Sequence, residues 1–221
     1  MHNLFPNVDW TAMGQAVWET LYMTIISAAA TFVLGLLLGL LLFMTSKDNL
    51  WENKAVNKVI GAFVNIFRSI PFIILIILLI PFTKLLVGTM LGVNAALPAL
   101  IIGAAPFYGR LVEIALREID KGVVEAAKAM GATTSTIIFK VLILESLPAL
   151  VSGITVTTIA LVGYTAMAGV VGAGGLGTLA YLEGFQRSNN DITFVATVLV
   201  LIIVFIMQWI GDMITTRIDK R

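Results

Sequence analysis

The sequence contains no cysteine and a single histidine, His2, among 221 residues. Disulfides, thiol catalysis and cysteine-ligated metal sites are therefore excluded, and a metal site built on histidines is not expected. Charge is scarce as well. Only 12% of the residues are charged and the formal net charge is +1, so nothing indicates nucleic-acid binding. The N-terminal stretch MHNLFPNVDWTAMGQ holds no lysine or arginine, so we expect no cleaved signal peptide.

Phosphate-binding motifs are also missing. No G-x-x-x-x-G-K-[ST] occurs, so the chain has no Walker-type phosphate cradle, and we expect no cofactor on it. Gly172, Gly174 and Gly177 form G-x-G-x-x-G, but dinucleotide binding requires a strand–turn–helix setting, and these glycines follow a hydrophobic stretch instead. We expect them to end a helix and to allow close packing or an irregular turn. Almost no ionisable residue lies near the middle of a hydrophobic stretch, which argues against an ion-coupled secondary transporter.

Hydrophobic residues dominate what is present: they make up 59% of the chain, with a mean hydropathy of +0.99. Soluble domains are about half apolar and about a quarter charged, so the composition indicates an integral membrane protein. A membrane-spanning helix needs roughly 20 mostly apolar residues. Because only helices or closed barrels satisfy their backbone in lipid, we predict an all-α, single transmembrane domain over residues 1–221 with five helical spans: 18–44, 60–82, 89–112, 147–170 and 192–214.

Two of these spans carry further signals. The third contains Asn94, Pro98 and Pro106, which predicts a kinked helix that faces protein rather than lipid. In the first, Gly35 and Gly39 are candidates for a small-xxx-small helix contact.

The basic residues set the predicted orientation. With the N-terminus outside and the C-terminus in the cytoplasm, only Lys84 and Arg187 of the 14 lysines and arginines lie outside. The positive-inside rule favours this arrangement, and it places the loop at 113–146 in the cytoplasm. The other twelve basic residues are Lys47, Lys54, Lys58, Arg68, Arg110, Arg117, Lys121, Lys128, Lys140, Arg217, Lys220 and Arg221.

The 113–146 loop is predicted to hold two short helices. The first, Gly122 to Met130, ends at Gly131, which suits a left-handed stop. Charge comes from Glu125 and Lys128. Three apolar side chains share one side at helical spacing: Ala126, Ala127 and Met130. We expect this helix to bury no face in its own chain, and its small side chains to admit the groove of another protein. The alternative is a helix lying on the membrane surface.

The residues on either side of that helix suggest local contacts. Thr133, Thr134 or Ser135 is expected to cap the second helix. Before the first helix, Glu113 is spaced to pair with Arg110 and Arg117 at i−3 and i+4.

Four residues are candidates for a solute path. Arg68 stands about 12 Å into the second span at 1.5 Å per residue, where it either snorkels to the inner surface or meets a substrate carboxylate in a water-filled path. Tyr164, Thr165 and Met167 precede the glycine run in the fourth span. We hypothesise that Met167 forms a constriction with its copy in a second subunit, the alternative being ordinary helix packing.

Several segments together resemble a known family. Glu125-Ala126-Ala127, three residues, Gly131 and a hydrophobic stretch ending in Leu147-Pro148 is similar to the EAA loop of ABC importer permeases. Thr134 and Leu144 stand where many relatives have prolines. Three further motifs resemble the permease subunit of methionine importers: Asn65-Ile-Phe-Arg-Ser-Ile-Pro-Phe72, Gly103-Ala-Ala-Pro-Phe107, and Leu161-Val-Gly-Tyr-Thr-Ala-Met167 with Gly172-Ala-Gly-Gly-Leu-Gly177.

The resemblance implies a transporter subunit in a bacterial cytoplasmic membrane that catalyses no reaction. Two copies of the chain would enclose the path, as C2 symmetry also favours for a five-helix protein. Two cytoplasmic ATPase subunits would bind ATP and Mg, with the Glu125–Gly131 helix seated in their grooves. An extracytoplasmic binding protein would deliver methionine, as the L isomer with the D isomer as a further candidate. The alternatives are a permease for another amino acid, an ion-coupled secondary transporter, or a membrane-embedded enzyme.

Overall fold

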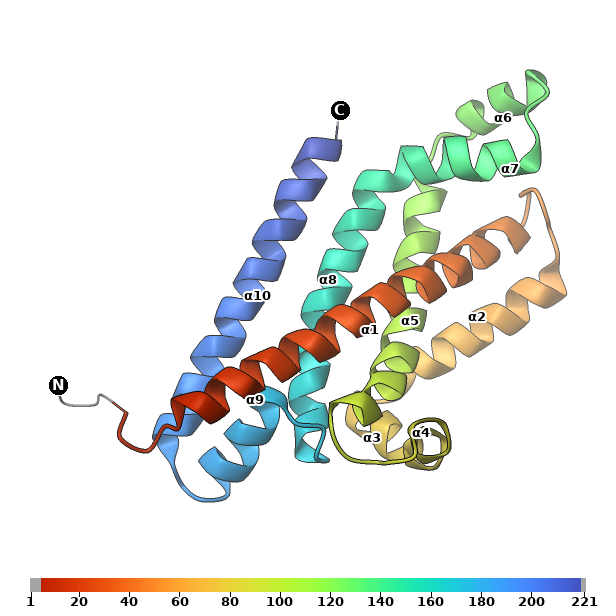
Figure 1. Ribbon diagram of the computed structural model, residues 1–221. Coiled ribbons are helices and arrows are strands. Elements are labelled where there is room, and N and C mark those ends of the chain that lie inside the picture. The colour runs from red at the N-terminus through yellow and green to blue at the C-terminus, as the bar shows by residue number, and fades with distance from the viewer. Residues whose placement is uncertain (1–4, 220–221) are drawn as a thin grey trace.

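The computed structural model describes residues 5–219, so His2, Lys220 and Arg221 lie outside the described residues. Within that range the chain consists of helices and the turns between them (Figure 1). The elements, of which η1 and η2 are π-helical, are α1 (Trp10–Thr45), α2 (Lys54–Ser69), α3 (Phe72–Leu78), α4 (Ile80–Val87), α5 (Val93–Arg117), α6 (Lys121–Ala129), α7 (Thr134–Thr136), η1 (Ile137–Leu142), α8 (Ile143–Val170), α9 (Gly175–Thr178), η2 (Leu179–Phe185) and α10 (Asn190–Ile218).

Four of the five predicted spans correspond to long apolar helices in the described part of the chain. These are α1, α5, the continuous helical segment Thr134–Val170 and α10. α5 is the central helix: fifteen of its 25 residues are buried, and it packs against α1, α8, α2 and α3. The prediction that this span faces protein is therefore confirmed. It remains one helix through both Pro98 and Pro106.

The second predicted span, 60–82, is not a single helix. α2 begins earlier, at Lys54, and ends at Ser69, and α3 then leaves at an angle of 106°. Pro71 explains the break, because proline disfavours the helical conformation of the residue before it. Ile70 is accordingly extended, with ψ at 123°. The prediction of one continuous helix was wrong, and the bent pair α2–α3 is the fifth candidate span.

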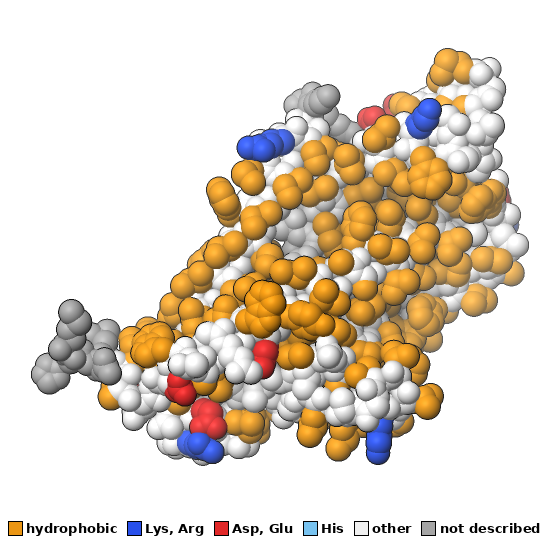
Figure 2. Space-filling model, viewed as in Figure 1, with side chains coloured by type: hydrophobic (Ala, Val, Ile, Leu, Met, Phe, Trp, Pro, Cys, Tyr) orange, Lys and Arg blue, Asp and Glu red, His pale blue; other side chains and the backbone are white. Residues whose placement is uncertain are grey.

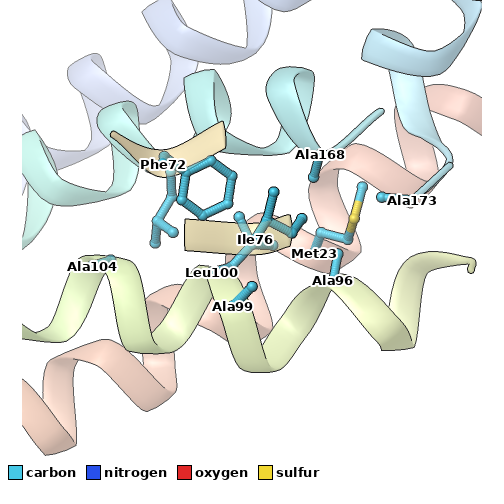
Figure 3. Packing of buried hydrophobic residues seen from close by; sticks show 10 residues of the cluster. Met23, Phe72, Ile76, Ala96, Ala99, Leu100, Ala104, Ala168 and Ala173 are labelled. Carbon is cyan, nitrogen blue, oxygen red and sulfur yellow. The ribbon is translucent and has the colours of Figure 1, made fainter. Parts of the chain in front are cut away.

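α3 fills the space between α5 and α8. Its Phe72 and Ile76 pack against Ala99, Leu100 and Ala104 of α5, with Met23, Ala168 and others completing the cluster (Figure 3). Many of the partners are alanines, so the helix axes approach closely.

Glycines make the contact between α1 and α5 close. A Cβ atom on Gly35 would lie 2.6 Å from Tyr108 Cδ1, and one on Gly39 would lie 2.4 Å from Val112 Cβ. The predicted small-xxx-small contact is therefore confirmed. Along the same side of α1, the hydroxyls of Thr24, Ser27 and Thr31 are buried without a hydrogen-bond partner.

Charge and apolar surface are separated. Figure 2 shows hydrophobic side chains across the middle of the visible face, with lysines, arginines and acidic residues gathered toward its two ends. The described N-terminal and C-terminal ends also lie at opposite ends of the molecule (Figure 1). This distribution suits a protein whose middle lies in hydrocarbon.

Candidate functional site

The helix predicted at Gly122 to Met130 is present as α6. Its first turn is capped by Asp120, whose Oδ1 accepts a hydrogen bond from the Gly122 amide at 2.7 Å. It stops at Gly131, which has φ of +79°, and the Ala132 amide then donates to the Ala127 carbonyl at 3.0 Å. Glycine favours this left-handed conformation because it has no Cβ. The predicted stop is confirmed.

One face of α6 is buried in its own chain, contrary to expectation. Ala127 is buried in a cluster with Met44, Leu116, Ile137 and Leu142. The reason lies in the second loop helix. It is not separate but runs from the Thr133 cap through α7 and η1 into α8, and so places Ile137 and Leu142 beneath α6.

The opposite face of α6 is open. Glu125 and Ala126 are exposed, and so are Val123 and Met130, the latter 82% exposed. Ala126 and Met130 therefore share the open face, and Ala127 does not belong with them. α6 lies at one extremity of the molecule (Figure 1) and leaves Val123 and Met130 uncovered.

The predicted ion pairs of Glu113 are confirmed. Its carboxylate, 2% exposed, accepts from Arg110 Nη1 at 2.5 Å and from Arg117 Nη2 at 2.7 Å. These contacts join neighbouring turns of α5 directly before α6 and fix the helix end from which α6 departs.

The candidate path residues divide into three groups. Arg68 and Tyr164 line one cavity of about 280 Å³ at the break between α2 and α3. Met167 lies outside that lining on α8 and is 47% exposed. Thr165 is buried, and its hydroxyl donates to the Val162 carbonyl at 2.7 Å. Its side chain therefore lies within the bundle, apart from the other three.

Sequence reasoning on single residues missed the aromatic walls of this cavity. The Tyr164 ring stacks on Phe72, with centroids 4.4 Å apart, and the Arg68 guanidinium lies 5.9 Å from the Phe107 centroid. Phe72, Gly103 and Phe107 all belong to the three motifs that carried the resemblance, so that signal was available.

Comparison with known proteins identifies the family. Residues 32–220 match the family described as binding-protein-dependent transport system inner membrane component. The chain belongs to this family. It is 73% identical, over 98% of both chains, to the methionine import system permease protein MetP of Bacillus subtilis. It is 49% identical to the probable D-methionine transport system permease protein MetI of Vibrio cholerae, over 96% of this chain and 97% of that one.

Solved structures agree with these relatives. The chain superposes with a TM-score of 0.94 on a chain of the MetNI methionine ABC transporter in an inward-facing conformation, at 46% identity over 96% of this chain and 98% of that one. An amino acid ABC transporter at 18% identity has a TM-score of 0.69 and shares the fold. The predicted resemblance to the permease subunits of methionine importers is confirmed, and the chain is a multi-pass membrane component of an ABC transporter family.

In this inner-membrane component, the G-x-G-x-x-G glycines form a turn between helices. Gly172 and Gly174 have φ of +87° and +89°, and the Gly175 amide donates to Glu19 Oε2 of α1 at 2.7 Å. A Cβ atom on Gly177 would lie 2.4 Å from the Ala166 carbonyl oxygen. The expectation of an irregular turn with close packing is confirmed.

Proposed function

We propose that this chain is the permease subunit of an ATP-driven importer of methionine, with the L isomer as substrate and the D isomer as a further candidate. The observation that carries the proposal is the 73% identity to a methionine import permease over nearly the whole chain. Two copies would enclose the path in a bacterial cytoplasmic membrane. Two separate ATPase subunits would bind ATP and Mg, and an extracytoplasmic binding protein would deliver the substrate.

The proposed orientation has the N-terminus outside and α6 in the cytoplasm. The positive-inside rule supports it, and so does the position of α6 at the extremity opposite to α3 and α4 (Figure 1). The open face of α6, with Glu125, Ala126 and Met130, would sit in the groove of the ATPase.

The continuous helical segment Thr134–Val170, which bends where α8 begins (Figure 1), supplies a physical link between that contact and the path. Ala127 of α6 packs on the start of this segment at Ile137, and Met167 stands near its far end, about 45 Å later along the bent helix (Figure 1) at 1.5 Å per residue. Closure of the ATPase dimer on ATP would draw the two α6 helices together. Because the segment stays helical through its bend, displacement of its start would be carried into α8. The far ends of the two α8 helices would then tilt and open the path outward, and hydrolysis would reset them.

Met167 is the proposed gate residue. It is an exposed, flexible apolar side chain on α8, and a second copy could face it across a two-fold axis. Met167→Ala is expected to let methionine leak through transporter-containing vesicles in the absence of ATP. The matched control is Met90→Ala, which truncates another methionine that is 54% exposed but lies between α4 and α5. Equal leak from both variants and the wild type would refute the gate.

The function itself is tested by reconstituting the chain with its co-expressed ATPase and binding protein in vesicles. Methionine uptake should require ATP and persist when ion gradients are collapsed. Uptake that follows an ion gradient would favour a secondary transporter. ATP-driven uptake of a different amino acid in preference to methionine would contradict the proposed substrate.

A further inference from the structure

The break between α2 and α3 faces a cavity with one charged side chain. Its lining includes Arg68, and the rest of the wall is mostly aromatic: Phe67, Phe72, Phe107 and Tyr164, with Gly103 between them. The volume, about 280 Å³, is at the lower end for small-molecule sites, which run from about 300 Å³ upward. Such a space suits a ligand of amino-acid size.

Arg68 has no carboxylate partner within the described chain. Arg110 and Arg117 both pair with Glu113, and Arg187 pairs with Glu183, whereas Arg68 contacts the face of Phe107. A guanidinium is costly at membrane depth unless an anion or water meets it. Its exposed side chain is therefore available to an incoming anion.

Arg68 lies at the end of α2 next to the break. Arg68 stands in the last turn of α2, fourteen residues after Lys54, or about 21 Å along the helix. α2 runs away from the end of the molecule that carries α6 and α7, and it finishes beside α3 and α4 (Figure 1). Arg68 therefore lies at the end of α2 that adjoins the break, away from α6 and α7 (Figure 1).

The backbone at the same place is also suited to a wet site. Ile70 is extended and lies in the cavity lining, directly after the last helical residue of α2. At membrane depth, non-helical backbone is tolerated only where protein buries it or where it borders a water-filled cavity. In transporters, such broken helices commonly border the substrate site.

We propose that this cavity is a transient binding site for the α-carboxylate of the transported amino acid, with Arg68 as its cationic contact. The guanidinium presents parallel N–H donors that match a carboxylate, while Phe107 and the Phe72–Tyr164 stack offer an apolar wall for the side chain. This inference rests on the proposed import function. It specifies a site for the carboxylate inside the permease itself.

The absence of cysteine makes a charge-replacement test possible. In the reconstituted transporter, Arg68→Cys removes the cation, and uptake at limiting methionine should fall about 10- to 100-fold, the range for a lost charge-assisted contact. Aminoethyl methanethiosulfonate, which adds a cation to the thiol, should restore much of the uptake. Methyl methanethiosulfonate, which adds a neutral group, should not. Saturating methionine should slow both modifications.

Two controls accompany this variant. Arg217→Cys alters another exposed arginine in the last turn of a helix, α10, and should leave uptake unchanged before and after either reagent. The unsubstituted transporter shows whether either reagent changes uptake by modifying cysteines of the partner subunits. If Arg68→Cys does not assemble, Arg68→Lys and Arg68→Gln replace it: the lysine variant should retain far more uptake than the glutamine variant at equal basal ATPase activity.

The outcomes separate the two proposals. A wild-type transporter without ATP-dependent methionine uptake overturns the function. An active wild type, together with Arg68→Cys or Arg68→Gln variants of unchanged uptake, overturns the site alone. The site is also overturned if neutral and cationic reagents restore uptake equally, or if methionine leaves the modification rate unchanged, as expected for a cation that only packs on Phe107 or holds a lipid phosphate.

Discussion

The close contact between α1 and α5 predicts a large penalty for one added methyl group. In Gly39→Ala the new Cβ would lie 2.4 Å from Val112 Cβ and 2.6 Å from the Gly109 carbonyl oxygen. Carbon atoms in contact are normally about 3.5–4.0 Å apart, so the helices must separate by about 1 Å. Neither contacting atom can rotate away, because the Gly109 oxygen belongs to the backbone and Val112 Cβ is bonded directly to its own Cα.

Overpacking of this kind costs about 1–3 kcal/mol. For a chain of about this size, each kcal/mol lowers the melting temperature by about 2–4 °C, so Gly39→Ala should lower it by about 2–12 °C. The measurement is thermal unfolding of the purified protein in detergent, followed by tryptophan fluorescence and size exclusion.

Gly14→Ala is the matched control on the same helix. Nothing lies within 4 Å of its added Cβ, and alanine favours a helix interior over glycine by up to about 1 kcal/mol. Its melting temperature should equal or exceed that of the wild type. If the two variants melt at the same temperature, the α1–α5 contact is not as close as described and the reasoning fails.

Three further predictions concern α6 and the orientation. Ala126→Arg, on the open face, should keep the melting temperature of the wild type but lower methionine-stimulated ATPase activity about tenfold. Ala127→Asp should lower the melting temperature, because Ala127 is buried. The reverse pattern would contradict the assigned faces. Gly131→Ala should cost about 1–2 kcal/mol, seen in thermal unfolding, because its φ is +79°. In intact cells, Lys84→Cys should react with a membrane-impermeant maleimide and Lys128→Cys only after permeabilisation; the opposite labelling would invert the orientation.

Features that depend on one helix were predictable from the sequence. Hydropathy located the long helices, and local spacing gave the Gly131 stop and the Glu113 ion pairs, because both are determined within one or two turns. Pro71 in the sequence signals a bend, but the prediction of one span gave more weight to the length of the apolar run. Continuous hydropathy cannot distinguish a straight span from a broken one.

Features that depend on two distant segments were not predictable from local patterns. We expected Ala127 to be exposed because nothing in α6 indicates that η1 extends beneath it. Arg68 and Tyr164 share a cavity only because α2 and α8 approach each other around α3. Thr165, two residues from Met167, faces the bundle because helical rotation separates their directions by about 200° at 3.6 residues per turn.

The contact between Glu19 and the glycine turn bears on where this protein can be cut. The family match covers residues 32–220, yet Glu19 and Thr20 supply the acceptors for the amides of Gly175 and Leu176, at 2.7 and 2.9 Å. Truncation at the similarity boundary would divide α1 and leave both amides without these acceptors. The part of the chain needed for these hydrogen bonds therefore extends beyond the range of the family match. Expression fragments or chimaeras should retain α1 from its Asp9 cap onward.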